Sequence, residues 1–403
     1  MRIVVQKFSG NAVAVPSTCT SAIEHIEAAA AQQCGVVVVV SALTGRAALS
    51  VTESGASALE HAAGISSREL DLVRASRDTV SAVTLASSLR SRKHDVIVLS
   101  GQQAGIITDN QHSDARILEI DPTRILESLA KGQIVVVMGC QGVTKSGELT
   151  RLGFGTSDTT AALIGTALGA DCVEIFTDVE GIMTADPRIV LNARCRTRAT
   201  YAEIYNLAYH GANVIHPLSV KIAMQRSIPI RVRRVESPTA GTLICCTAGD
   251  MERVTWDSQC ITGITQVSNI AQISLERPPA DNVNVLSLLQ RRGVDVDYIS
   301  MERDCLTFTI QNSSKDVAIA VLAEHGFAPT TISDCARVSM VGTGITNDPG
   351  TIARVVSTLA SHGIRILLSG NAYNAIWCLV EQRDMERAVR ALHQEFETEL
   401  CSL

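Results

Sequence analysis

The first 245 residues alternate short apolar runs, rich in β-branched residues, with longer stretches of helical periodicity. The apolar runs cover residues 3–6, 36–41, 95–99, 134–138, 173–177 and 228–232. Runs of this length are typical of strands buried on both faces of a sheet. The helical stretches cover residues 20–33, 78–90, 122–131, 159–168 and 201–207. The alternation predicts an α/β fold, a three-layer αβα sandwich with a mainly parallel sheet.

The pattern changes after residue 245, where strand–helix–strand–strand patterns occur twice in succession. The first set covers residues 271–275, 283–291, 295–299 and 305–310. The second covers residues 338–341, 349–362, 365–368 and 376–380, with a further helix at 384–396. A repeat of roughly 70 residues has the size of a small βαββαβ module. We therefore predict domains at 1–246, 259–330 and 336–403.

Composition excludes several classes of protein. The net charge of −6 and the aromatic content of 3% argue against a nucleic-acid partner. No apolar run approaches the ~20 residues of a membrane span, and residues 1–8 lack the apolar region of a signal peptide. The twelve cysteines form no CxxC pair, so we expect reduced, mostly buried thiols and a cytoplasmic protein that contacts no membrane.

A lysine follows the first predicted strand in the run Lys7-Phe-Ser9-Gly10. A lysine at this place can reach a phosphoryl group, and Gly10 lets backbone N–H groups approach an anion. The run is not a P-loop, because no GxxxxGK[ST] pattern is present. A solvated lysine at the end of a strand is the alternative interpretation.

A glycine-containing loop, Gly-Phe-Gly-Thr-Ser-Asp-Thr-Thr at 153–160, leads into a predicted helix. Ser157 or Asp158 would cap this helix, whose free N–H groups and dipole favour an anion. Asp158 could also align the Lys7 ammonium or a metal near the phosphoryl group. The alternative is a capped loop without a ligand.

Acidic residues follow the strand at 173–177. Asp178 comes directly after it, and the run Asp186-Pro187-Arg188 comes soon afterwards. A carboxylate at a strand end can bind ribose hydroxyls or Mg²⁺, and Arg188 can reach a phosphate. Asp186-Pro187 alone would also be consistent with a simple turn.

These motifs, in this order, resemble the aspartate kinase family within the amino-acid kinase superfamily. The resemblance covers nearly the whole chain, and it is carried by residues 7–10, 100–109, 115–120, 139–142, 157–160, 177–188, 216–217, 229–232 and 241–244. The C-terminal half resembles the paired ACT modules of that family. The resemblance implies an amino-acid-kinase-like catalytic domain and ATP-dependent phosphorylation of the aspartate side chain to 4-phospho-aspartate, with Mg²⁺. This reaction is the first step toward lysine, threonine and methionine. It also implies a small amino-acid substrate and a homodimer or larger assembly formed through the ACT-like modules.

The resemblance also implies roles for individual residues. The catalytic pair would be Lys7 and Asp158. Substrate binding would involve Ser41, Asp78, Phe154, Gly155, Thr156 and Ser157. Nucleotide binding would involve Lys7, Ser9, Gly10, Thr177, Asp178, Met183, Asp186, Pro187, Arg188 and Asn213. No residue is assigned as a metal ligand.

Several positions depart from the family pattern. Phe154 stands where an arginine normally grips a substrate carboxylate, and Asp78 is one methylene shorter than the usual glutamate. Asn213 replaces a nucleotide-site lysine, and the effector-site Gln-Asn pair reads Met301-Glu302. The first two losses together could weaken aspartate binding by ~10²–10⁴-fold. We therefore expect an aspartokinase-type enzyme that phosphorylates aspartate or a related amino acid on a carboxylate, and the departures point to a changed substrate or poor catalysis. The alternative is a catalytically weak homologue that binds a ligand or partner; the paired modules disfavour a carbamate or glutamate kinase.

Overall fold

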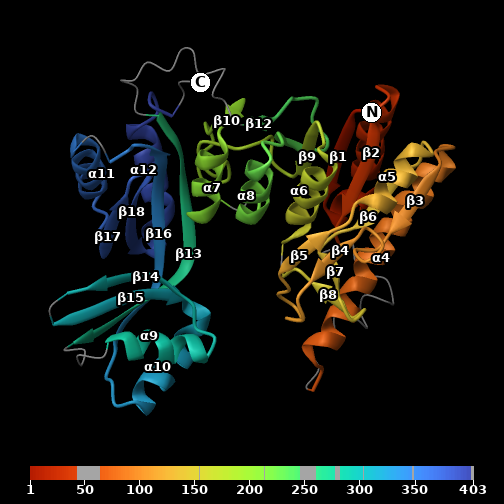
Figure 1. Ribbon diagram of the computed structural model, residues 1–403. Helices are drawn as coiled ribbons and strands as arrows, with labels where there is room; N and C mark the ends of the chain where they lie inside the picture. Colours follow the sequence, from red (N-terminus) through yellow and green to blue (C-terminus); the bar gives the residue numbers. More distant parts are fainter. Residues whose placement is uncertain are drawn as a thin grey trace.

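The computed structural model describes residues 1–42, 64–153, 155–212, 214–245, 260–276, 282–302, 304–346 and 349–400. An N-terminal half is built around an eight-stranded sheet, and a C-terminal half is built around a six-stranded sheet (Figure 1). The Lys7 motif, the glycine-containing loop and the acidic residues after 177 all belong to the first half. The repeated strand–helix pattern forms the second.

The eight-stranded sheet has a long parallel centre. Its order is β10 (Arg198–Ala199), β12 (Thr242–Ile244), β11 (Ile230–Arg234), β9 (Cys172–Thr177), β1 (Ile3–Phe8), β2 (Gly35–Val40), β6 (Ile134–Met138) and β3 (Val96–Leu99). Every neighbouring pair is parallel except β11 and β12. The five consecutive valines of β2, at 36–40, are buried because helices cover both faces.

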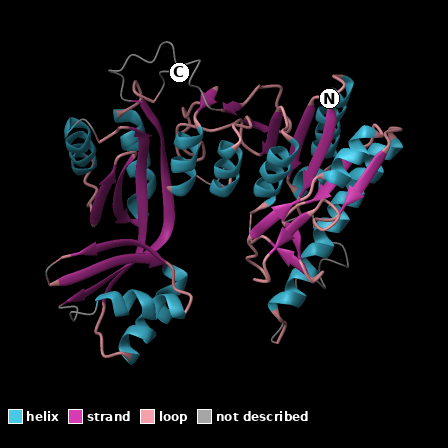
Figure 2. Cartoon of the chain, viewed as in Figure 1, coloured by secondary structure: helices cyan, strands magenta, loops and turns pink. Residues whose placement is uncertain are grey.

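Helices form a layer on each side of this sheet (Figure 2). One layer packs on a core shared with α1 (Gly10–Ala14), α2 (Pro16–Ala31) and α4 (Ser67–Ser91). The other packs on a core shared with α5 (Thr123–Ala130), α6 (Ser157–Leu168), α7 (Tyr201–Tyr209) and α8 (Pro217–Gln225). The predicted three-layer αβα sandwich with a mainly parallel sheet is confirmed.

Helix α4 begins at Ser67, well before the predicted start at 78. Ser66 caps it, because the Ser66 hydroxyl accepts a hydrogen bond from the Glu69 N–H while the Glu69 carboxylate accepts one from the Ser66 N–H, 2.9 Å away. This reciprocal capping box satisfies two N–H groups that the helix itself leaves unpaired. The Ser-x-x-Glu signal was present in the sequence, and the prediction missed it.

A second sheet of the N-terminal half was not predicted. It has the order β5 (Ile117–Ile120), β4 (Ile106–Thr108), β7 (Gln141–Thr144) and β8 (Leu149–Arg151). Each strand has only three or four residues, which is too short for a reliable alternation of apolar and polar residues.

In the described part of the C-terminal half, an antiparallel sheet is accompanied by four α-helices. Its strand order is β14 (Val296–Met301), β15 (Cys305–Gln311), β13 (Cys260–Glu276), β16 (Thr330–Thr343), β18 (Ala375–Glu381) and β17 (Leu368–Ala372). The helices are α9 (Asn282–Arg291), α10 (Lys315–Glu324), α11 (Pro349–Ser361) and α12 (Met385–Glu395). This order of elements matches the βαββαβ pattern expected from the sequence.

The two modules share their longest strands. The second part of β13, with Ala271 and Ile273, packs in one core with α9 and α10. The first part, with Ile261 and Ile264, packs in a different core with β16, α11 and α12. The second module therefore takes a strand from the start of the range 259–330, which the prediction assigned wholly to the first module. The predicted boundaries were sequential, whereas the packing is interleaved.

Candidate active site

Lys7 and Asp158 form an ion pair at the carboxyl ends of the central strands. Lys7 lies near the end of β1, and Asp158 lies in the first turn of α6. The Lys7 Nζ is 2.9 Å from the Asp158 Oδ1, and the two side chains are only 12% and 10% exposed. The Asp158 Oδ2 also accepts a hydrogen bond of 3.2 Å from the His216 backbone N–H. Asp158 is therefore held from two directions, and one of its oxygens contacts the Lys7 ammonium.

The start of α6 differs in detail from the prediction. Thr156 is the N-cap residue, so the expectation that Ser157 or Asp158 would cap the helix was wrong. The Thr156 hydroxyl donates to the Gly153 carbonyl at 2.9 Å, and it makes no side-chain capping bond. N–H groups of the first turn are thus not capped by a side chain, which suits an anion. Gly155 precedes the cap with a φ of +74°, a backbone conformation that glycine adopts without strain.

Ser9 and Gly10 begin the short helix α1 directly after β1. The Ser9 hydroxyl accepts from the Ala12 N–H at 3.4 Å and so caps this helix. Gly10 is the first helical residue and is buried. The structure therefore places the backbone at 9–10 next to Lys7, although the Ser9 hydroxyl already has a partner.

A cavity of about 920 Å³ lies beside the end of β9. It is lined by six residues that the sequence assigned to nucleotide binding: Thr177, Asp178, Met183, Asp186, Pro187 and Arg188. The register of the parallel strands pairs Lys7 with Ile175, two positions before Thr177. The cavity and the Lys7–Asp158 pair therefore lie at the ends of adjacent strands. Asn213 lies outside the described residues, although Ala212 and Val214 on either side of it line the cavity.

The wall of this cavity carries the charged pair of Asp186 and Arg188 and the carboxylate of Asp178. The Arg188 guanidinium donates to both oxygens of Asp186, with its NH2 group 2.7 Å from Oδ2. The Arg188 side chain itself is 87% exposed. Hydrogen bonds from Arg188 are the main cause that lowers the pKa of the Asp186 carboxyl. Asp178 is exposed, and its Oδ1 accepts from the Thr177 hydroxyl at 3.0 Å.

Asp78 lies in the interior of the protein, on the inner face of α4. Its carboxylate has no exposed surface, and its Oδ2 accepts hydrogen bonds from Arg151 and from the Gln141 side chain. Burial raises the pKa of the Asp78 carboxyl, although Arg151 and Gln141 act in the opposite direction. The sequence assigned Asp78 to the substrate amine, whereas the structure shows it bound to Arg151. Ser41 is half-buried just after β2, and Phe154 lies outside the described residues.

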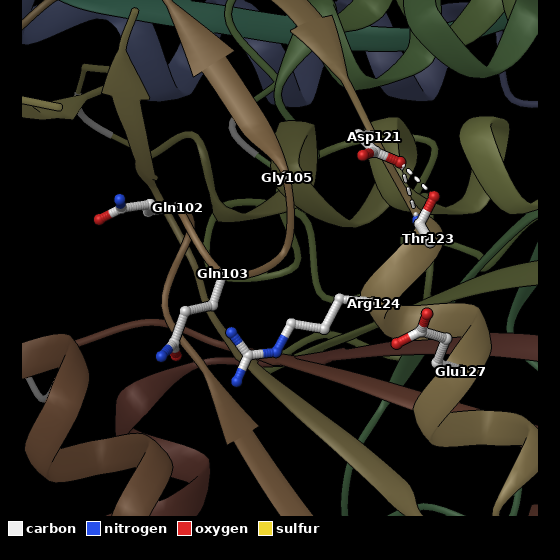
Figure 3. Close-up of a pocket in the computed structure, with 7 residues that line it drawn as sticks. All are labelled: Gln102, Gln103, Gly105, Asp121, Thr123, Arg124 and Glu127. Atoms are coloured by element: carbon white, nitrogen blue, oxygen red, sulfur yellow. Dashed lines mark hydrogen bonds between the residues drawn. The ribbon is translucent and has the colours of Figure 1, made fainter. Parts of the chain in front are cut away.

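A second cavity, of about 630 Å³, lies between the β4–β5 region and α5 (Figure 3). Its lining residues are Gln102, Gln103, Gly105, Asp121, Thr123, Arg124 and Glu127. Asp121 accepts a hydrogen bond of 3.0 Å from the Thr123 N–H at its rim. None of the residues assigned to the site from sequence lines this cavity.

Three further findings concern classes of site. Within the described ranges, no helix has the length and apolar character that crossing a membrane requires. The same residues hold no group of three or more His, Cys, Asp or Glu side chains placed to bind a metal. Of the nine cysteines that the structure describes as free, only Cys140, Cys335 and Cys378 are buried, so the expectation of mostly buried thiols was wrong.

Comparison with known proteins shows which family the chain resembles. The amino acid kinase family model matches residues 2–234, and an ACT domain model matches residues 330–394. Aspartokinase 1 of Bacillus subtilis is 39% identical over 403 residues, which cover 98% of this chain and 99% of that protein. The aspartokinase of Geobacillus stearothermophilus is 35% identical, with coverage of 98% and 97%. Escherichia coli aspartokinase III, solved with aspartate and ADP, has the same fold, with a TM-score of 0.83 at 23% identity over 98% of this chain and all of that one. The chain belongs to the aspartokinase family.

Proposed function

We propose that this enzyme transfers the γ-phosphoryl group of ATP to the side-chain carboxylate of L-aspartate, forming 4-phospho-L-aspartate and ADP. The observation that carries the proposal is the nearly buried Lys7–Asp158 pair beside a cavity lined by six predicted nucleotide-site residues. Membership of the aspartokinase family supports the choice of acceptor.

The chemistry required of the protein is mainly electrostatic. A carboxylate oxygen of the acceptor attacks the γ-phosphorus while the bond to the ADP oxygen breaks, and negative charge spreads over the phosphoryl oxygens. The Lys7 ammonium would stabilise this charge, and Asp158 would keep it in position. The uncapped first turn of α6 and the backbone at Gly10 would supply further N–H groups to the same anion.

Nucleotide binding is assigned to the cavity at the end of β9. Arg188 would meet a phosphate, because its side chain is exposed while its orientation is fixed by Asp186. Mg²⁺ fits this site, because it takes one or two carboxylates together with phosphate oxygens and Asp178 offers an exposed carboxylate on the wall. Bound Mg²⁺ would neutralise charge on the β- and γ-phosphates.

Acceptor binding is assigned to Ser41 and residues 155–157, close to Lys7 and Asp158. Arg151 is the cation that we propose in place of the family arginine. Its side chain is 12% exposed, and the buried Asp78 holds it. A guanidinium so fixed can meet a substrate carboxylate with two parallel hydrogen bonds. Asp78 then serves to position Arg151 more directly than to bind the substrate amine.

A hydroxamate assay with ATP, Mg²⁺ and a panel of amino and hydroxy acids tests the proposal, alongside direct ADP binding. We expect turnover with L-aspartate, and a better rate with another acidic acceptor would identify a changed substrate. ADP binding without turnover on any acceptor would instead support the alternative of a binding protein, which the burial of Asp78 favours.

We further propose that the chain forms a homodimer or larger assembly through residues 259–403. The edge strand β14 supports this, because Ile299 and Met301 on it are exposed. A mass measurement that shows a monomer at micromolar concentration would contradict the proposal.

A further inference from the structure

One wall of the proposed nucleotide cavity comes from the C-terminal half of the chain. Residues 264–268 of β13, together with Gln311 at the end of β15, line it beside the 177–188 segment. No motif in the sequence predicted these residues near a nucleotide. β13 and the 177–188 segment therefore form one cavity together.

Thr184 connects the cavity segment to two elements of the C-terminal half. Its backbone carbonyl accepts a hydrogen bond of 2.8 Å from the Ile264 N–H of β13. Its hydroxyl accepts from the Arg194 N–H at 3.0 Å and lies 3.0 Å from the His393 Nε2 of α12. Thr184 and His393 are 1% and 2% exposed, so water does not compete for these bonds. The backbone of the segment is therefore fixed against β13 and α12.

The close approach of β13 to this segment leaves little room for a side chain at Gly263. A Cβ atom at Gly263 would lie 3.1 Å from the Thr184 carbonyl oxygen and 3.3 Å from the Leu207 side chain. Residues 185, 189 and 190 of the segment also pack in the hydrophobic core of the second module. The segment thus belongs to the nucleotide cavity on one side and to the C-terminal core on the other.

Gln266 reaches from β13 to the charged pair on the cavity wall. Its Nε2 donates to the Asp186 Oδ2 at 3.2 Å, and the same oxygen accepts from the Arg188 NH2 at 2.7 Å. Asp186 has a 15% exposed side chain, whereas that of Arg188 is 87% exposed. A long exposed arginine loses much side-chain entropy when a ligand fixes it, and a partner that already orients it reduces that loss.

We propose that Gln266 is a positioning residue for the nucleotide. It holds the Asp186 carboxylate, and through it the Arg188 guanidinium, in place to meet a phosphate of ATP or ADP. The inference rests on the proposed function, because it needs a nucleotide in this cavity. It assigns to the C-terminal half a direct share in nucleotide affinity, in addition to any ligand that half binds itself.

The test compares single variants of the full-length protein by ADP titration calorimetry and by steady-state kinetics. We expect Gln266→Ala to raise the Kd for ADP about fivefold, an amount typical of one hydrogen bond. The KM for ATP should rise in parallel, while kcat and the KM for the acceptor stay near the wild-type values. Gln266→Glu should weaken ADP binding further, because a carboxylate would face Asp186.

Two controls separate positioning from a general structural effect. Gln272→Ala removes the same side chain from the same strand, where Gln272 instead contacts Ser274, and it should leave the Kd unchanged. In an Asp186→Asn background, Gln266→Ala should lose most of its effect, because the two residues act as one unit. An unchanged Kd in Gln266→Ala would overturn the inference, as would an equal loss in Gln272→Ala or full additivity with Asp186→Asn. Failure of the wild-type protein to bind ADP would overturn the nucleotide site itself, and that result is distinct from the others.

Discussion

The Lys7–Asp158 pair allows a quantitative test of the proposed catalytic roles. The two charges are 2.9 Å apart and about one-tenth exposed, so water screens them less than a surface pair but more than a fully buried one. Charges at a similar separation attract by about 4 kcal/mol at an effective dielectric constant near 20, and the cost of removing them from water offsets much of this. Removing Lys7 should therefore change kcat more than it changes stability, because Lys7 is proposed to face charge that develops in the transition state.

We expect Lys7→Ala to lower kcat by at least ~10²-fold, the usual effect of losing one preorganised charge or donor. Asp158→Asn keeps the ammonium but removes the group that positions it, so it should lower kcat by up to ~10²-fold. Because Asp158 is proposed to act through Lys7, the double variant should be scarcely slower than Lys7→Ala alone. The hydroxamate assay measures all three, and circular dichroism confirms that each variant is folded.

A second ion pair of the same sheet supplies the matched control. Glu174 and Arg233 lie 3.0 Å apart on β9 and β11, with side chains 14% and 19% exposed. The strand register places Glu174 beside Gln6, so the Glu174 side chain lies on the opposite face of the sheet from Lys7. Glu174→Gln removes a comparable charge pair on that face, so it should change stability and leave kcat unaltered. Unchanged turnover in Lys7→Ala would remove Lys7 from the mechanism. Full additivity of the Lys7 and Asp158 effects would refute the view that Asp158 works by positioning Lys7.

Three further predictions concern stability, pH and the acceptor. Asp78→Asn should lower the free energy of unfolding in urea by about 3–5 kcal/mol, because Arg151 loses its buried partner. Adding Arg151→Met to the same chain should restore much of this stability. Equal stability of the wild type and Asp78→Asn would contradict the pairing. Burial, followed by repulsion from Arg337, lowers the pKa of His210 to about 4, so the unfolded chain, with an ordinary histidine pKa near 6.5, binds more protons below about pH 6.5. Stability should thus fall as the pH drops from about 6.5 to 4, and unfolding curves of His210→Gln should show a shallower fall. Phe154→Arg should lower the KM for aspartate at least ~10-fold, and no change in a folded variant would show that this position does not face the acceptor.

The predicted fold followed from local patterns, and the missed parts lacked them. Residues 36–40 are five valines, a pattern that indicates a buried strand without further information. The long strands β13 and β16 contain several register shifts, which interrupt the alternation of residues and move side chains from one face to the other. The two modules share these strands through tertiary packing, which a local sequence pattern does not predict.

Site residues that stand in a motif were predicted, and those that only the fold brings together were missed. Lys7 and Asp158 were identified because each stands in a motif whose residue types imply a phosphate, and the fold then brings them together. Gln266 was missed because a glutamine in a strand gives no chemical signal, and its role depends on Asp186 being opposite. The Arg151–Asp78 contact was missed because it forms only when the fold packs α4 against β8.

The departures from the family pattern have a common electrostatic setting. The thiol of Cys140 is buried, and burial is the main cause that raises its pKa; the charges of Asp78, Arg151 and Lys7 also act on it. The Arg151–Asp78 pair and the lysine of the Lys7–Asp158 pair thus both act on this thiol. We propose the Lys7–Asp158 pair at the transferred phosphoryl group and the Arg151–Asp78 pair on the acceptor side. An acidic acceptor entering between them must compete with Asp78 for Arg151, because Asp78 already occupies that guanidinium. A carboxylate that positions a cation also limits how strongly the cation binds another carboxylate. The family arginine is lost while Lys7 and Asp158 are retained. We therefore expect the departures to weaken acceptor affinity more than they slow phosphoryl transfer.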